Sequence, residues 1–274
     1  MQLGIFTRVF EGRFEDVLYQ IRSHGLTHIQ FNFRSAGLSS LPAHIEDDQI
    51  KKIGRQIKSN QLQLAAISGT FNMIHPDPRE VERGIQSFRC IAHASSLLNN
   101  PMITLCTGSR DPLDKWKYHP GNTYAEAWSD MCSIMEKLLP IAEEADVLLG
   151  IEPEVGNVVS DAEKGKRLLG EMQSNRLRVV FDPANLIRAG SAQVANQTIA
   201  SSLELLAGHI EIVHAKDRKA DDMVCRPGKG LVDFSHLAAV LRRLNVDPLV
   251  LIHDIRPDEV AVSTRFLRQA FEAG

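Results

Sequence analysis

The stretch VLLGIEPEVGN at residues 147–157 shows the pattern on which the fold prediction depends. It is a short apolar run that ends in two carboxylates, Glu152 and Glu154. An apolar run without polar–apolar alternation is typical of a parallel strand that is covered on both faces. Because side chains alternate along a strand, Glu152 and Glu154 are expected to point to the same side.

Similar apolar runs recur along the chain and are separated by longer amphipathic stretches. The eight predicted strands are Leu3–Thr7, Thr27–Asn32, Leu62–Ile67, Met102–Cys106, Val147–Glu152, Leu177–Asp182, His209–His214 and Pro248–His253. The clearest helix is predicted for residues 123–146, where apolar side chains recur at spacings of three and four. Another helix is predicted to begin after Asp233, a good N-cap. Strict alternation of strands and helices predicts an α/β fold, a closed (β/α)₈ TIM barrel.

The length of the chain agrees with one such domain. A barrel of this kind needs about 250 residues, and the chain has 274, so a single barrel domain is predicted for residues 1–274. A doubly wound open sheet is the alternative, but it would usually carry a Gly-rich phosphate turn after the first strand. Residues 8–12 contain no such motif. The longest irregular segment, Thr107–Asn122, follows the fourth strand, and long loops in compact domains are often functional.

Composition excludes several classes of function. A net charge of −3 disfavours a nucleic-acid partner. No apolar run approaches the roughly 20 residues that span a bilayer, so no membrane partner is expected. The N-terminal residues lack the features of a signal peptide. The four cysteines are scattered without a Cys-x-x-Cys pair, which disfavours a disulfide framework and a structural zinc site. A cytoplasmic protein is therefore expected.

Ionisable residues stand at the ends of four consecutive predicted strands. They are Glu152, Asp182, His214 and His253. In a barrel, the C-terminal ends of the strands face the active site. Taken singly, an Asp before Pro is more often a turn residue and a His at a strand end is more often structural. Four such residues at matching ends are hard to explain structurally, because a buried charge must be paired or bind a metal.

We therefore predict one divalent metal ion, Mn²⁺, Mg²⁺, Co²⁺ or Zn²⁺, at these strand ends. Its predicted ligands are Glu152, Asp182 and His214, with His253 as a candidate fourth ligand. Two neighbouring carboxylates repel one another, and a cation between them removes that repulsion.

Further polar residues in the strand-end loops are candidates for binding substrate. They are Asn72, His75, His119, Glu154, Asn185, Lys216 and Arg226. The loop with Asn72 and His75 could line the pocket or cap the next helix. Residues 116–122, which include His119, could form a lid or lie as an ordinary surface loop. Lys216 could neutralise an oxyanion or pair with Glu154.

Arg226 could meet an anionic group of the substrate. The segment around it, residues 226–230, has two glycines but does not connect a strand to a helix as a phosphate-binding loop does. It is predicted to be a turn that leads to Asp233.

The ordered motifs IEPE (151–154), FDPAN (181–185), VHAKD (213–217) and PGKGLVDF (227–234) resemble the xylose-isomerase-like barrel superfamily. More narrowly, the chain is similar to the sugar phosphate isomerase/epimerase group, which includes ketose 3-epimerases, inosose dehydratases and an AP-endonuclease branch. The resemblance runs over nearly the whole chain. It implies a (β/α)₈ fold and a divalent metal ion.

The resemblance also implies roles for individual residues. In the ketose epimerases the ligands are Glu, Asp, His and Glu on strands five to eight, and Glu152, Asp182 and His214 match the first three. The chain departs at His253, where the family has the second glutamate of its acid–base pair, so two-base chemistry is in doubt. It departs again at Asn185, where the epimerases and the endonucleases have His.

The leading hypothesis is a metal-dependent isomerase or epimerase that acts on a sugar, a sugar phosphate or a polyol-derived ketone through an enediolate. Glu152 would abstract the proton next to the carbonyl, and His253 is the candidate second acid–base group. The alternatives are a metal-dependent dehydratase of a keto-polyol and a catalytically inactive barrel that binds a small molecule. A DNA phosphodiesterase is disfavoured by the net charge and by Asn185. The expected partner is a small carbohydrate. The sequence leaves open whether the chain forms a homo-oligomer.

Overall fold

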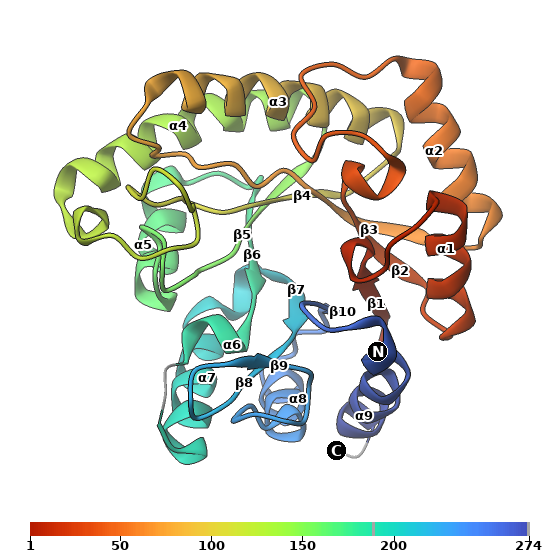
Figure 1. The fold of residues 1–274 in the computed structure, drawn as a ribbon. Coiled ribbons are helices and arrows are strands. Elements are labelled where there is room, and N and C mark those ends of the chain that lie inside the picture. Colours follow the sequence, from red (N-terminus) through yellow and green to blue (C-terminus); the bar gives the residue numbers. More distant parts are fainter. Residues whose placement is uncertain (188–189, 273–274) are drawn as a thin grey trace.

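The computed structural model describes residues 1–187 and 190–272, in which eight parallel strands close into a barrel (Figure 1). Around the barrel the order of the strands is β1-β10-β7-β6-β5-β4-β3-β2. Their bounds are β1 Leu3–Phe6, β2 His28–Phe31, β3 Gln63–Ser68, β4 Met102–Leu105, β5 Leu148–Ile151, β6 Leu177–Phe181, β7 Ile210–Ala215 and β10 Leu249–Ile252. The eight predicted strands and the (β/α)₈ fold are therefore confirmed, with every strand end within one residue of its prediction.

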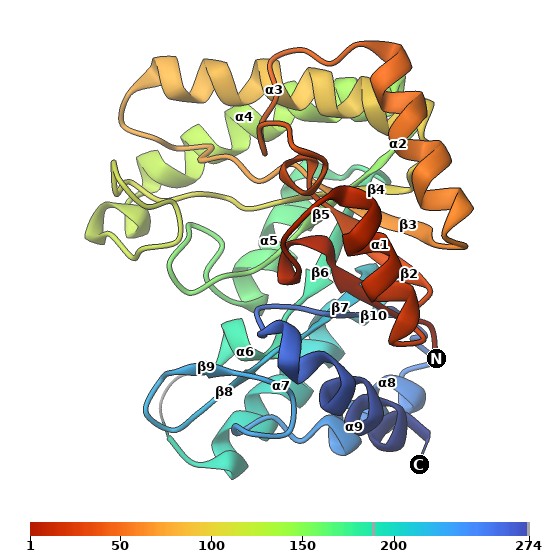
Figure 2. The ribbon, with the colours of Figure 1, turned by 45° about the vertical axis from the view of Figure 1, so that its right-hand side comes forward.

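Helices surround the barrel, as Figures 1 and 2 show from two sides. The α-helices are α1 Phe14–Ser23, α2 Asp47–Ser59, α3 Pro78–Leu97, α4 Ala125–Glu144, α5 Ala162–Met172, α6 Pro183–Leu186, α7 Ala192–Leu206, α8 Phe234–Arg243 and α9 Val260–Glu272. Short 3₁₀ helices are η1 Thr7–Val9, η2 Phe33–Ala36, η3 Pro120–Thr123, η4 Ala207–His209 and η5 Pro257–Glu259. In the part of the chain that the structure describes, no helix has the length and apolar character needed to cross a membrane.

Both helices predicted in detail are present. The stretch at 123–146 forms α4, and α8 begins after Asp233, whose carboxylate accepts a hydrogen bond from the backbone N–H of His236 at 2.9 Å. Such a cap satisfies an N–H group that has no partner within the helix. The N-cap of α3 is Asp77, which accepts a hydrogen bond from the N–H of Arg79 at 2.9 Å.

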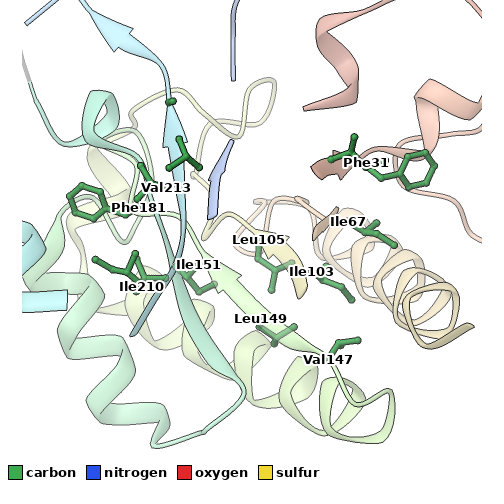
Figure 3. Close-up of a cluster of buried hydrophobic side chains, with 14 of the residues drawn as sticks. Phe31, Ile67, Ile103, Leu105, Val147, Leu149, Ile151, Phe181, Ile210 and Val213 are labelled. Atoms are coloured by element: carbon green, nitrogen blue, oxygen red, sulfur yellow. The ribbon is translucent and has the colours of Figure 1, made fainter. Parts of the chain in front are cut away.

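Alternation along each strand divides the core into an outer and an inner part. Leu149 and Ile151 of β5 belong to the large outer cluster between strands and helices (Figure 3). Gly150 faces the interior, where a Cβ atom would lie 2.6 Å from Met102 Sδ and 2.7 Å from Val180 Cγ2. Side chains thus fill the barrel interior, and the next inward position of β5, Glu152, lies at its C-terminal end.

A small two-stranded sheet follows β7. Its strands are β8 Asp217–Arg218 and β9 Val224–Cys225, which pair antiparallel. The buried Asp217 carboxylate accepts hydrogen bonds of 2.8–3.2 Å from the backbone N–H groups of Arg218, Gly228, Lys229, Gly230 and Val232. The predicted turn at 226–230 is present, and its backbone N–H groups point to this carboxylate.

Candidate active site

The C-terminal ends of β5, β6 and β7 bring three predicted ligands together. Glu152, Asp182 and His214 are all buried, and each offers one ligand atom within 4.8 Å of the other two. His214 Nδ1 lies 3.2 Å from Glu152 Oε1 and 3.9 Å from Asp182 Oδ2. Residues from three different strands thus direct two oxygens and one nitrogen at a common point.

These atoms fit a divalent cation. Asp182 Oδ1 accepts hydrogen bonds from the N–H groups of Ala184 and Asn185 at the start of α6, whereas Asp182 Oδ2 is buried without a hydrogen bond. The Lys216 ammonium lies 3.2 Å from this oxygen, which keeps lone pairs that a cation can also bind. Two carboxylates and an imidazole are ligands that Mn²⁺, Co²⁺ and Zn²⁺ accept, and Mg²⁺ accepts the carboxylates. Glu152, Asp182 and His214 could therefore hold one divalent ion.

Gln30 of β2 orients the histidine. His214 Nε2 lies 2.8 Å from Gln30 Oε1, which can only accept, so Nε2 carries a proton and Nδ1 faces the carboxylates. Gln30 Nε2 in turn donates to Thr104 Oγ1 at 3.4 Å. Gln30 was not among the site residues predicted from the sequence. The feature that could have identified it is an amide side chain in an otherwise apolar part of a buried strand.

Lys216 adds a positive charge to the site. Its side chain is buried, and its Nζ lies 3.2 Å from Asp182 Oδ2 and 3.3 Å from Asp254 Oδ2. Burial by itself lowers the pKa of Lys216, but Asp182 and Glu152 outweigh it and raise that pKa above its usual range. The ammonium group therefore stays charged. Lys216 pairs with Asp182 and Asp254, rather than with Glu154 as the sequence suggested.

The three carboxylates at this end of the barrel differ in their affinity for protons. Burial raises the pKa of Asp182, with Lys216 opposing the rise and Glu152 adding to it. Burial acts on Glu152 too, but His214 and Lys216 hold the pKa of Glu152 below its usual range. Burial raises the pKa of Glu154 to about 7. One strand end thus carries an ionised and a readily protonated carboxyl group, an arrangement suited to acid–base chemistry.

His253, at the end of β10, lies in an aromatic stack. Its ring packs on Phe6 at a centroid distance of 4.6 Å and on His214 at 4.5 Å, with interplanar angles of 9° and 20°. His253 Nδ1 lies 3.2 Å from Asp254 Oδ1. Burial lowers the pKa of His253, but Asp254 outweighs it and raises that pKa. His253 is not in the three-residue group that could hold a metal, so its role as a fourth ligand stays a prediction.

A cavity of about 540 Å³ opens above these residues. Five predicted site residues line it, namely Glu152, Glu154, Asn185, Lys216 and His253. Asn185 Nδ2 donates to Glu152 Oε1 at 2.8 Å, which holds that carboxylate in place. Cavity-lining residues that the sequence analysis did not single out include Phe6, Arg8, Asn32, Ser68, Thr104, Lys115 and Arg218.

Four other predicted substrate-binding residues lie outside the lining of this cavity, namely Asn72, His75, His119 and Arg226. Asn72 and His75 line a second cavity of about 900 Å³, and Lys115 and Trp116 line both cavities. Asn72 Nδ2 donates to the carbonyl of Ser109, and the ring of His75 lies between the N–H of Asp77 and the carbonyl of Pro112.

His119 and Arg226 are also engaged within their own loops. His119 accepts a hydrogen bond from the N–H of Gly121 at 3.0 Å, and Arg226 donates to the carbonyl of Pro227 at 3.0 Å. Neither residue lines the first cavity. Their roles in substrate binding stay predictions, as do those of Asn72 and His75.

Comparisons with known proteins place this geometry in context. A family model described as a xylose isomerase-like TIM barrel matches residues 18–270. No curated protein matches the chain. A solved D-tagatose 3-epimerase-like protein is 16% identical, with a TM-score of 0.79 over 100% of this chain and 98% of that one.

Two further solved structures are similar. A 3-keto-D-glucoside 4-epimerase from E. coli is 14% identical, with a TM-score of 0.77 over 98% of this chain and 99% of that one. A probable 3-DHS dehydratase from Bacillus anthracis is 13% identical, with the same TM-score and the same coverage. At these identities the likeness concerns the fold.

Proposed function

Because the chain belongs to the xylose isomerase-like TIM barrel family, we propose that it is a metal-dependent isomerase or epimerase of a sugar or sugar derivative. The observation that carries this proposal is the convergence of Glu152, Asp182 and His214 beneath one cavity. The similar solved structures include sugar epimerases, which is in keeping with a carbohydrate substrate. The cavity offers hydroxyl and amide groups for sugar hydroxyls, among them Ser68, Thr104 and Asn32.

The metal would be held by Glu152, Asp182 and His214. When bound, it supplies Lewis-acid stabilisation of the negative charge that develops on substrate oxygens. Glu152 is the base that takes the proton next to the carbonyl, since its lowered pKa keeps it ionised and Asn185 fixes its orientation. A positioned base contributes about 10²–10⁴-fold to the rate.

His253 is the second proton-carrying group in this proposal. His253 lines the cavity, its ring stacks on that of His214, and Asp254 favours its protonated form. In an epimerase it would return a proton to the face opposite Glu152. A proton donor in that place equally suits a dehydratase, in which it would protonate the departing hydroxyl group. The dehydratase is therefore the second candidate, distinguished by a product that absorbs in the near ultraviolet.

The test is exchange of the substrate's α-proton with solvent. Wild-type protein with Mn²⁺ is incubated in D₂O with free ketohexoses, their phosphate esters and 3-ketoglucosides, and deuterium incorporation is followed by NMR. Glu152→Gln should lower the exchange rate by about 100-fold or more. Glu211→Gln is the control, because Glu211 lies exposed near the opposite end of β7 and pairs with Arg178. Undiminished exchange in Glu152→Gln, or no exchange of any substrate by the wild type, would contradict the proposal.

A further inference from the structure

We propose that the substrate carries an anionic group, a carboxylate or a phosphate, and that Arg8 binds it. This inference rests on the proposed function, because it concerns the substrate of the same site. Arg8 lies in η1, directly after β1, and its half-buried side chain lines the 540 Å³ cavity. Among the residues that the structure describes, Arg8 makes no ion pair and no side-chain hydrogen bond. A guanidinium group that lines a cavity without a carboxylate partner is available to a ligand.

A second arginine, Arg218, lines the same cavity as Arg8. Arg218 belongs to β8, directly after β7, and β10 lies between β7 and β1 in the barrel. Arg218 Nε donates to the carbonyl of Ala184 at 2.7 Å, and its Nη1 donates to Asp222 at 3.0 Å. Its Nη2 has no partner among the described residues. Arg8 and Arg218 thus follow the two strands that flank β10, and both line the cavity.

The charges of the cavity support an anionic ligand. Four cationic side chains line it, from Arg8, Lys115, Lys216 and Arg218, against three carboxylates from Glu152, Glu154 and Asp254. Asp182 beneath them and Asp222, the partner of Arg218, bring the carboxylates to five. A divalent ion would then leave an excess of positive charge at the site, although the chain as a whole has a net charge of −3. A neutral sugar would leave this excess uncompensated, whereas a carboxylate or phosphate group reduces or cancels it.

Arg226 is the residue that the sequence suggested for an anionic group, and its role in binding substrate stays a prediction. Its Nη1 donates to the carbonyl of Pro227, and it lies outside the cavity lining. The planar guanidinium of Arg8 can bind either a carboxylate or a phosphate through two parallel hydrogen bonds. The site therefore recognises the anionic group that sugar acids and sugar phosphates share.

The test compares three probes of similar shape by calorimetry on the Mn²⁺-loaded protein: D-glucitol, D-gluconate and D-glucitol 6-phosphate. At least one anionic probe should bind more tightly than D-glucitol. Arg8→Met should weaken binding of that probe about 10- to 100-fold, the usual effect of losing a charge-assisted hydrogen bond. It should leave D-glucitol binding and Mn²⁺ affinity unchanged, and Arg8→Lys should restore part of the loss. A preference for the phosphate or for the carboxylate identifies the source of the anionic group.

Arg13→Met is the control, because Arg13 is exposed and pairs with Asp16 outside the cavity. If both anionic probes bind no more tightly than D-glucitol, or if Arg8→Met keeps their affinity, the inference is wrong. The two proposals fail differently. Proton exchange on neutral ketoses, together with no tighter binding of either anionic probe, would overturn this inference and leave the proposed function intact. Anion binding that depends on Arg8, without exchange of any substrate, would support the anion site and contradict the proposed function.

Discussion

Gln30 is a single residue that determines which nitrogen of His214 faces the carboxylates. Its Oε1 accepts from His214 Nε2 at 2.8 Å, and the two residues are 184 positions apart in the chain. Partners of this kind fix the tautomer and the ring orientation of a metal-binding histidine.

We therefore expect Gln30→Met to weaken metal binding about 10- to 100-fold, because the imidazole loses the acceptor that holds its proton on Nε2. The measurement is a titration with Mn²⁺ or Zn²⁺ against a competing chelator. Gln63→Met is the matched control, since Gln63 is exposed at the start of β3. Equal metal affinity in Gln30→Met and the wild type would show that Gln30 only fills space.

Among the elements, the β8–β9 sheet and the turn after it depend on one carboxylate. Asp217 accepts five backbone hydrogen bonds, of which four come from residues 228–232. These bonds hold the segment that carries Arg218 against the end of the barrel. The glycine at 230 is required by this packing, because a Cβ atom there would lie 2.3 Å from Asp217 Oδ1.

Asp217→Asn should lower the free energy of unfolding by about 3 kcal/mol, because an amide has one acceptor oxygen and leaves buried N–H groups without a partner. Urea denaturation at pH 7 measures the change. Asp221→Asn serves as the control in the same hairpin, since Asp221 is exposed and accepts a hydrogen bond from the N–H of Met223. A loss no greater than that of the control would mean that the loop is held by other contacts.

At the scale of the whole molecule, the barrel assembles the site from distant parts of the sequence. Glu152 and His214 are 62 residues apart and reach contact distance because their strands end at the same rim. A ligand that binds only the folded protein stabilises it by mass action. The proposed metal should therefore stabilise the entire domain.

At about 100 times its Kd, the metal should raise the free energy of unfolding by about 2.7 kcal/mol. We expect Mn²⁺ to raise the melting temperature of the wild type, EDTA to reverse the effect, and Asp182→Asn to remove most of it. Asp258→Asn is the control, because Asp258 forms an exposed pair with Arg256. Equal stabilisation of Asp182→Asn and the wild type would count against the site.

The sequence by itself determined the barrel and the centre of its candidate site. Short apolar runs separated by amphipathic stretches located the ends of each strand to within one residue. The alternation of side chains along a strand directed Glu152, Glu154, His214 and Lys216 inward, and the parallel order of the strands placed their ends at one rim. These features depend on local periodicity, which a sequence displays directly.

Only the tertiary structure decided which loop residues reach the cavity. Arg8, which the sequence did not suggest, lines it, whereas the suggested residues His75 and His119 do not. His75 lies 3.1 Å from the carbonyl of Pro112 in the next loop, and His119 accepts a hydrogen bond from the N–H of Gly121. The stack of Phe6, His253 and His214, like the contact between Gln30 and His214, joins strands that are distant in the chain. Backbone hydrogen bonds and packing with remote residues determine the path of a loop, and no periodic pattern of side chains encodes those partners.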